Sequence, residues 1–195
     1  RLCDPAIVQR VIEAGPAAIE ALTRLGARFD RGADRALRLS LEAAHGRRRI
    51  VHATGDGTGR EVLRAVVAAI RATASITVLE GMEARRLLVR NNAVAGVLVA
   101  GPARTGGGAG VLRTNRVVIA TGGVGGLFRD TTNPAGAWGG GLALAARAGA
   151  ALRDMEFVQF HPTALDRNTL PLGLVSEAVR GDGAVLIDEH GLRFM

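Results

Sequence analysis

The stretch VVIATGG, residues 117–123, joins a run of apolar side chains to a pair of glycines. An uninterrupted apolar run is typical of a strand buried on both faces, and we expect residues 111–121 to form such a strand. Glycines at its end let a ligand approach the backbone closely, with amides exposed to a bound anion. A plain turn would explain the same glycines equally well. The stretch alone therefore predicts the strand and leaves the ligand site open.

Three helices are predicted around this strand. Asp4-Pro5 places an N-cap residue before a proline at the first helical position. Gly15-Pro16 should kink or split the helix that follows, and Gly26 should end it. Thr58-Gly59 opens a second helix, and residues 139–149 contain a third, because in both segments apolar side chains return every three or four positions.

Shorter stretches predict the remaining β-structure. Residues 85–90 and 93–100 flank Asn91-Asn92, a dipeptide that tolerates the positive φ of a tight hairpin turn. We also expect strands at 76–79 and 157–161, a flexible glycine-rich hairpin tip at 101–110, and a short helix and then a hairpin around Glu189-His190-Gly191 within 174–195.

This order of elements predicts an α/β fold, part of a Rossmann-like nucleotide-binding domain with a β insertion. A second unit should begin near Gln159, which divides the chain into residues 1–158 and 159–195. Because both ends read as mid-protein sequence, we expect an internal piece of a longer protein.

Composition narrows the range of partners. The net charge is +7 and all basic residues are arginines, but they are scattered, and aromatic residues make up only 3%. Stacking surfaces for bases are therefore scarce, so we expect no nucleic-acid binding and favour anionic small molecules. No apolar run has the length of a membrane span. The single Cys3 suits a reducing compartment, and no Cys and His spacing predicts a metal site.

One histidine and one polar cluster are candidates for a binding site. His161 precedes Pro162, so it should lie at a strand terminus where a substrate-facing residue could stand, although a core or surface histidine is the ordinary alternative. Ser176, Glu177 and Arg180 bring a hydroxyl, a carboxylate and a guanidinium within two helical turns. They could form a carboxylate-binding corner or only a solvated ion pair.

Taken in order, six motifs resemble the flavoprotein subunits of succinate dehydrogenases, fumarate reductases and L-aspartate oxidases. The motifs are VVIATGG, TTNP, GLALAARAGA, DMEFVQFHPTAL, SEAVRGDGA and GLRFM. The resemblance runs along the whole chain. EAAHGRRRIVHATGDGTGREV at 42–62, Ala164 where the dehydrogenases typically have glycine, and PLGLVSEAVRGDGA at 171–184 resemble the L-aspartate oxidase family in particular.

The resemblance implies FAD-dependent oxidation of L-aspartate to iminoaspartate for quinolinate and NAD biosynthesis, with oxygen or fumarate as acceptor. Glu42, where the dehydrogenases typically have Gln, would bind the substrate ammonium group, and His161 a substrate carboxylate. Ser176 and Glu177 would line the pocket, and Arg180 would support it. The residues that would contact FAD are Glu83, Ala84, Ala120, Thr121, Gly122, Gly123, Asn133 and Gly140.

The same resemblance implies a cytoplasmic enzyme with quinolinate synthase as a downstream partner, and an α+β capping domain that begins at residue 159. Many members have TGDG where this chain has Trp138-Gly139-Gly140-Gly141, so Gly140 replaces an FAD-contacting Asp. The family's N-terminal glycine motif and its proton-transfer arginine lie outside these 195 residues. We therefore expect this fragment alone to be inactive. The alternatives are a fumarate reductase or succinate dehydrogenase flavoprotein subunit and a non-catalytic truncated remnant.

Overall fold

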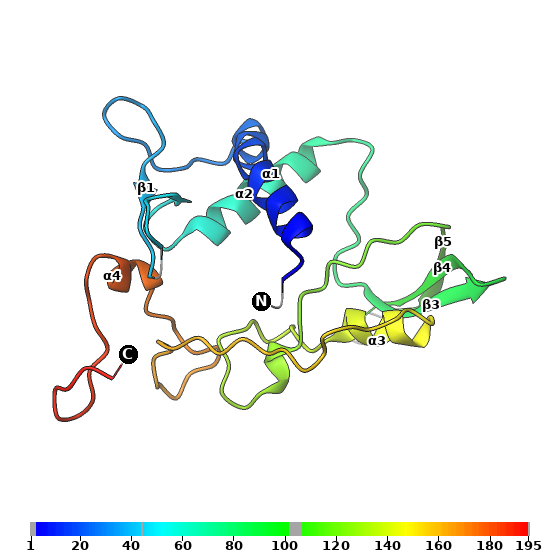
Figure 1. Cartoon of the computed structure of the whole chain (residues 1–195). Helices are drawn as coiled ribbons and strands as arrows, with labels where there is room; N and C mark the ends of the chain where they lie inside the picture. The colour runs from blue at the N-terminus through cyan, green and yellow to red at the C-terminus, as the bar shows by residue number, and fades with distance from the viewer. Residues whose placement is uncertain (1–2, 44, 102–106, 195) are drawn as a thin grey trace. The chain divides into compact units, whose positions relative to one another are not determined.

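The computed structural model describes residues 3–43, 45–101 and 107–194 (Figure 1). These residues form two compact units. One contains the chain up to Thr77 together with the residues from Ser176 onward, and the other is Val78–Val175. Helices and sheets are mixed in the chain, which confirms the predicted fold class. The predicted domain boundary between residues 158 and 159 stays a prediction.

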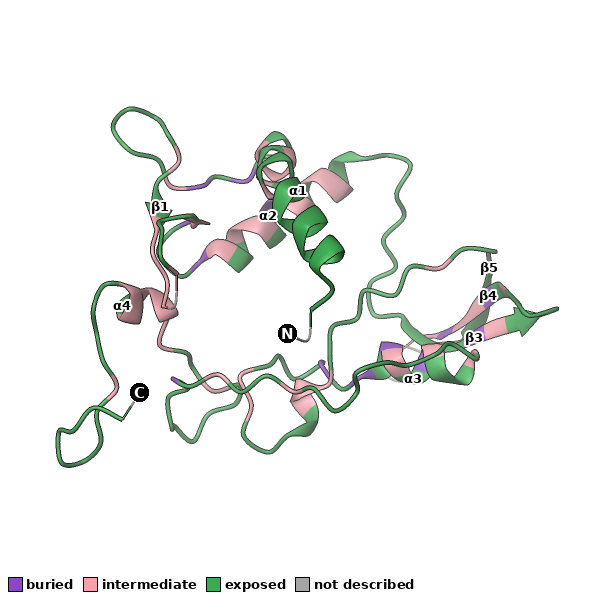
Figure 2. Cartoon of the chain, in the orientation of Figure 1, coloured by how far each residue is buried: buried purple, intermediate pink, exposed green. Residues whose placement is uncertain are grey.

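The first unit begins with helix α1, Pro5–Arg24. Asp4 Oδ1 accepts a hydrogen bond from the Ala6 amide at 2.9 Å, as expected of the N-cap. Gly26, with φ +95°, follows the last turn and confirms the predicted end. Of the two outcomes predicted at Gly15-Pro16, a kink or a split, the split was wrong, because α1 is continuous through Pro16. Proline removes a single backbone donor, and α1 has no buried residue, so water can reach the carbonyl left behind (Figure 2).

The core of this unit lies where α1 meets helix α2, Thr58–Ala72. The short strands β1, Leu39–Ser40, and β2, Ile50–Val51, pair antiparallel beside it. The buried residues of this core are small or aromatic: Ala27, Phe29, Ala53 and Ala65. Partly buried apolar side chains pack against them: Ile19, Leu22, Leu37, Val51 and Val62. The predicted start of α2 at Thr58 is thus confirmed.

A carboxylate ties α2 to the turn after α1. Glu61 Oε1 accepts hydrogen bonds from the Arg28 amide and from Arg64 Nη2, both at 2.7 Å, and the same Arg64 nitrogen donates to the Gly26 carbonyl. The hydrogen bond from Arg64, reinforced by that from Arg28, lowers the pKa of Glu61 to about 2. The ionised carboxylate therefore stabilises the folded state.

This network predicts an acid-sensitive contribution to stability. The pKa of Glu61 falls from 4.5 to about 2 on folding, so the contribution is complete above 4.5 and is lost as the pH falls towards 2. We expect Glu61→Gln to lower the urea midpoint of the chain at pH 7 and to have much less effect at pH 2. Equal losses at both pH values would contradict the assignment. Glu20→Gln, on the exposed face of α1, is the control.

The second unit is built on an antiparallel sheet of order β3-β4-β5, with β3 at Glu83–Arg90, β4 at Ala93–Ala100 and β5 at Ala109–Arg113. The predicted hairpin is confirmed, because Asn91 and Asn92 turn between β3 and β4 with φ of 50° and 59°. Helix α3, Gly140–Arg147, packs against β3, as Figure 1 shows. Leu87, Val99 and Leu144 are buried in this unit.

Two predicted strands are absent from the described residues, and a third is shorter than predicted. Segments 76–79 and 157–161 pair with no neighbour, and β5 ends at Arg113 instead of continuing to residue 121. A strand needs a partner for its backbone hydrogen bonds, and none lies beside these segments in the described chain. Val118 is accordingly 91% exposed and Phe160 83% exposed. Within the predicted hairpin tip, residues 102–106 lie outside the described residues.

The chain closes with helix α4, Glu177–Gly181, followed by a turn that brings Ile187 opposite Arg193. Both the predicted short helix and the predicted hairpin are confirmed. Ser176 is the N-cap of α4, and its Oγ accepts from the Ala178 amide at 3.2 Å.

Candidate cofactor and substrate site

The glycines of VVIATGG lie against the start of α3. The Gly139 amide donates to the Gly123 carbonyl at 2.9 Å, and the Gly126 amide donates to the Ala137 carbonyl at 2.8 Å. A Cβ on Gly141 would collide with the Thr121 hydroxyl. The two glycine-rich segments, far apart in the sequence, therefore pack backbone to backbone.

This junction leaves open backbone that a ligand can approach. Gly122 and Gly123 are exposed, and a Cβ on either would meet no atom within 4 Å. Gly140 begins α3 with equally open space, and no side chain caps that helix. Exposed amides and an uncapped helix start suit a pyrophosphate or a flavin edge, so the residues present fit a flavin dinucleotide.

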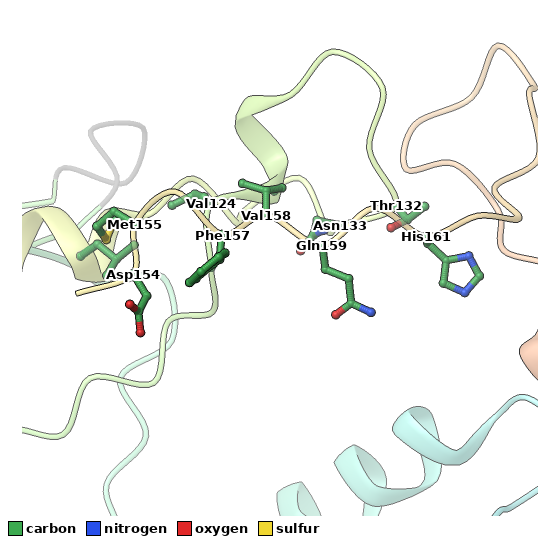
Figure 3. A pocket seen from close by; sticks show the side chains of 12 residues that line it. Val124, Thr132, Asn133, Asp154, Met155, Phe157, Val158, Gln159 and His161 are labelled. Carbon is green, nitrogen blue, oxygen red and sulfur yellow. The ribbon is translucent and has the colours of Figure 1, made fainter. Parts of the chain in front are cut away.

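An open groove of about 480 Å³ runs along this junction (Figure 3). Its lining includes Gly123 and Asn133 together with residues of the segment 154–161. The side chains of Phe157, Gln159 and His161 point to one side of that segment and Val158 points to the other, as Figure 3 shows. The segment therefore keeps the alternation of a strand although it has no ladder.

His161 is oriented by the loop that follows it. Its Nδ1 accepts a hydrogen bond from the Thr163 amide at 3.2 Å. The Thr163 hydroxyl donates to the Val175 carbonyl at 3.0 Å, and the Val175 amide returns a bond to the Thr163 carbonyl. Because Nδ1 is an acceptor here, a neutral His161 carries its proton on Nε2. The loop therefore fixes the orientation of the His161 ring.

A second polar group forms at α4, in the first unit. Arg180 Nη2 lies 2.7 Å from Glu177 Oε1, and the two side chains are 19% and 36% exposed. Arg180 Nε is buried and has no hydrogen-bond partner within residues 3–43, 45–101 and 107–194. An unsatisfied buried donor costs about 1–3 kcal/mol, so stability alone does not explain this arginine.

Glu42 belongs to the same corner. The carbonyl of Leu41 and the Cα of Glu42 press against Gly181, the last residue of α4. The His45 amide donates to the Glu42 carbonyl at 3.1 Å and closes a turn behind it. Sequence separates Glu42 widely from Glu177 and Arg180, but the fold brings this backbone and α4 together.

A histidine–aspartate pair holds the loop that leads into α2. His52 Nδ1 lies 2.9 Å from Asp30 Oδ2, and Asp30 Oδ1 accepts from the Thr54 amide at 3.1 Å. The hydrogen bond from the Thr54 backbone amide, together with the contact to the His52 side chain, lowers the pKa of Asp30. Thr54 has a positive φ of 49°, and these bonds keep it there.

The predicted site residues thus fall into groups. The groove contains Gly123, Asn133 and His161, with Thr121, Gly122 and Gly140 at the junction beside it. Ala120 is exposed in the same segment. Glu42, Ser176, Glu177 and Arg180 gather at α4. Glu83 and Ala84 begin β3, beside a break in its register with β4, and do not line the groove.

Sequence analysis missed several groove residues: Thr132, Asp154, Met155, Phe157 and Gln159. Alternation could have identified Gln159, because it lies two positions before His161 and points to the same side. In the described chain no three His, Cys, Asp or Glu side chains are grouped to hold a metal ion. Nor does any described helix combine the length and the apolarity needed to cross a membrane.

The chain belongs to the FAD binding domain family, whose model matches residues 1–195. It is also similar over its whole length to curated L-aspartate oxidases. The Mesorhizobium japonicum L-aspartate oxidase is 59% identical over 194 residues, and the Agrobacterium fabrum L-aspartate oxidase is 56% identical over the same length. The chain covers 37% and 36% of these two proteins, so it spans little more than a third of their length.

Solved structures show the same fold. The FrdA E245Q variant of Escherichia coli quinol fumarate reductase superposes with a TM-score of 0.87 at 28% identity, covering 98% of this chain and 32% of that one. Mycobacterium smegmatis Sdh1 gives a TM-score of 0.77 at 34% identity, covering 94% of this chain and 32% of that one. FAD is therefore the cofactor of the domain to which this chain belongs.

Proposed function

We propose that the chain is part of an L-aspartate oxidase, which converts L-aspartate to iminoaspartate. The observation that carries this proposal is the corner at α4, where the backbone of Glu42 meets the helix that holds Glu177 and Arg180. A carboxylate and a guanidinium in one corner can recognise an ammonium group and a carboxylate of one small molecule. The whole-chain similarity to L-aspartate oxidases supports the same substrate.

Each polar residue has a proposed task in binding the substrate. Glu42 binds the ammonium group, and His161 holds one carboxylate. Arg180 supports the pocket from α4, with its position fixed by Glu177. Ser176 caps α4, and with Glu177 it lines the same pocket.

Bound FAD would supply the acceptor for the hydride that leaves the substrate Cα, with oxygen or fumarate as the final acceptor. The residues proposed to hold it are the open backbone of Ala120, Thr121, Gly122 and Gly123, with Asn133, Gly140, Glu83 and Ala84. The Asn133 side chain lies directly over Gly125, where a Cβ would collide with its amide group. This packing holds the Asn133 amide in the groove.

Restoring a carboxylate at residue 140 should tighten FAD binding. Gly140 begins α3, and a Cβ at this position would meet no atom within 4 Å. For Gly140→Asp in the full-length protein we expect an FAD dissociation constant about threefold to tenfold lower, measured by flavin fluorescence. Gly140→Ala is the matched control, and an equal gain with alanine would contradict a role for the carboxylate.

The proposed reaction has a defined set of products. With oxygen as acceptor, each aspartate oxidised yields one iminoaspartate and one hydrogen peroxide, and hydrolysis of the imine releases one ammonium ion and oxaloacetate. We expect the full-length protein to form peroxide and ammonium in a ratio of one. Peroxide without ammonium, or no turnover of aspartate, would contradict the proposal.

A dicarboxylate dehydrogenase or reductase is the second candidate. The observation that favours it is the structural likeness to the quinol fumarate reductase variant, at a TM-score of 0.87. Such an enzyme would oxidise succinate or reduce fumarate, and neither substrate offers an ammonium group to Glu42. Turnover of succinate in place of aspartate would select this candidate.

Two further parts of the proposal concern the cell. We place the enzyme in the cytoplasm, and we place quinolinate synthase downstream as the consumer of iminoaspartate. The free thiol of Cys3, exposed in the structure, is compatible with a reducing compartment. A change in the apparent iminoaspartate yield on adding quinolinate synthase would test the second part.

A further inference from the structure

The backbone conformation at residue 181 does not require a glycine. Gly181 is the last residue of α4, and it is not among the residues with positive φ, unlike Gly183, whose φ is +105°. Any residue could adopt the backbone of Gly181, and alanine would favour the helix by about 1 kcal/mol. Some other constraint must therefore explain this glycine.

The constraint is the space between α4 and residues 41–42. A Cβ on Gly181 would collide with the Leu41 carbonyl oxygen, and it would lie 2.7 Å from the carbonyl carbon and 2.9 Å from Glu42 Cα. All three are backbone atoms, so no side-chain rotation can relieve the collision. Glycines elsewhere in helices of this unit lack such neighbours, since a Cβ on Gly15 or Gly59 would meet nothing within 4 Å.

We propose that Gly181 is a positioning residue that sets the distance of Glu42 from α4 and so the preference for an aminated over a non-aminated dicarboxylate. The inference rests on the proposed oxidation of L-aspartate. A side chain at 181 pushes the backbone of Glu42 away from the helix that carries Glu177 and Arg180. The carboxylate of Glu42 then no longer meets the ammonium group while a carboxylate is held at the other end of the substrate. A dicarboxylate without an amine does not use Glu42 and is little affected.

The test uses the full-length flavoprotein and its Gly181→Ala variant, with Gly59→Ala as the matched control. The readouts are KM and kcat for L-aspartate, the inhibition constant of succinate, and the flavin content. For Gly181→Ala we expect KM for aspartate to rise about tenfold or more, because small displacements of a positioning group have effects of this size. The succinate inhibition constant and the flavin content should stay near their original values, and Gly59→Ala should change none of them.

A second variant separates positioning from packing. In the Glu42→Gln background, Gly181→Ala should add little to the KM for aspartate, because both changes act through one carboxylate. Fully additive effects, parallel rises for aspartate and succinate, loss of flavin or folding, or an unchanged KM would each overturn the proposal. If the unmodified protein oxidises no aspartate, the proposed function fails instead, and the two failures are therefore distinguishable.

Discussion

Glu42→Gln in the full-length protein is expected to lower kcat/KM for L-aspartate by about tenfold to a hundredfold, because a hydrogen bond to a charged partner contributes about 1.5–3 kcal/mol. The amide keeps the shape of the side chain and loses its negative charge. The substrate ammonium group then faces a neutral carbonyl in the half-buried setting of Glu42. Steady-state kinetics with L-aspartate measure the loss.

Succinate supplies the internal control for this substitution. It has the two carboxylates of aspartate without the amine, so its inhibition constant should change little in Glu42→Gln. Glu20→Gln removes a carboxylate that is 73% exposed on α1, and it should leave both values unchanged. Equal weakening of aspartate and succinate would mean that Glu42 maintains the pocket as a whole and does not recognise the amine.

Arg180→Lys is expected to reduce kcat/KM for aspartate by about tenfold to a hundredfold and to weaken succinate binding in parallel. Lysine keeps the positive charge but lacks the planar guanidinium, which can donate two parallel hydrogen bonds to one carboxylate. In this chain the guanidinium contacts Glu177 through Nη2 and is largely enclosed by protein. A lysine ammonium cannot keep that contact and also support a substrate carboxylate.

An exposed ion pair on another helix of the same unit provides the control for Arg180. Glu20 and Arg24 pair at 3.9 Å on the surface of α1, where both side chains are more than 70% exposed. Arg24→Lys should be neutral, since pairs of this kind contribute little. Full activity of Arg180→Lys with unchanged succinate binding would contradict a role for the guanidinium in the pocket.

Local features of the fold could be predicted from the sequence. The N-cap at Asp4 and the turn at Asn91-Asn92 depend on residues a few positions apart, and both are present. A split at Pro16 was also predicted from local rules and did not occur, because an exposed helix tolerates the loss of one backbone donor.

Long-range features could not be predicted in the same way. The apolar run 117–120 is able to form a strand, but it does so only if a neighbouring strand pairs with its backbone. Its own residues do not specify that neighbour. The site shows the same limit. The resemblance to a known family identified Glu42 and Arg180 as separate candidates. Only the structure shows that the backbone of residue 42 lies against α4 at Gly181.

The groove illustrates what side-chain alternation adds to a motif. His161 was identifiable because it precedes a proline in a specific motif, whereas Gln159 and Phe157 also line the groove and point to the same side of the segment as His161 (Figure 3). Thr132 and Asn133 reach the same groove from a turn. No period relates that turn to residues 154–161, so sequence alone could not combine them.

The most direct measurement is the flavin absorbance of the full-length protein under anaerobic conditions, first with L-aspartate and then, in a separate sample, with succinate. Oxidised flavin loses its visible absorbance when it accepts a hydride, so the measurement reports the first chemical event without an external acceptor. The account predicts bleaching by L-aspartate and none by succinate. Bleaching by succinate alone, or no bleaching by either compound, would contradict it.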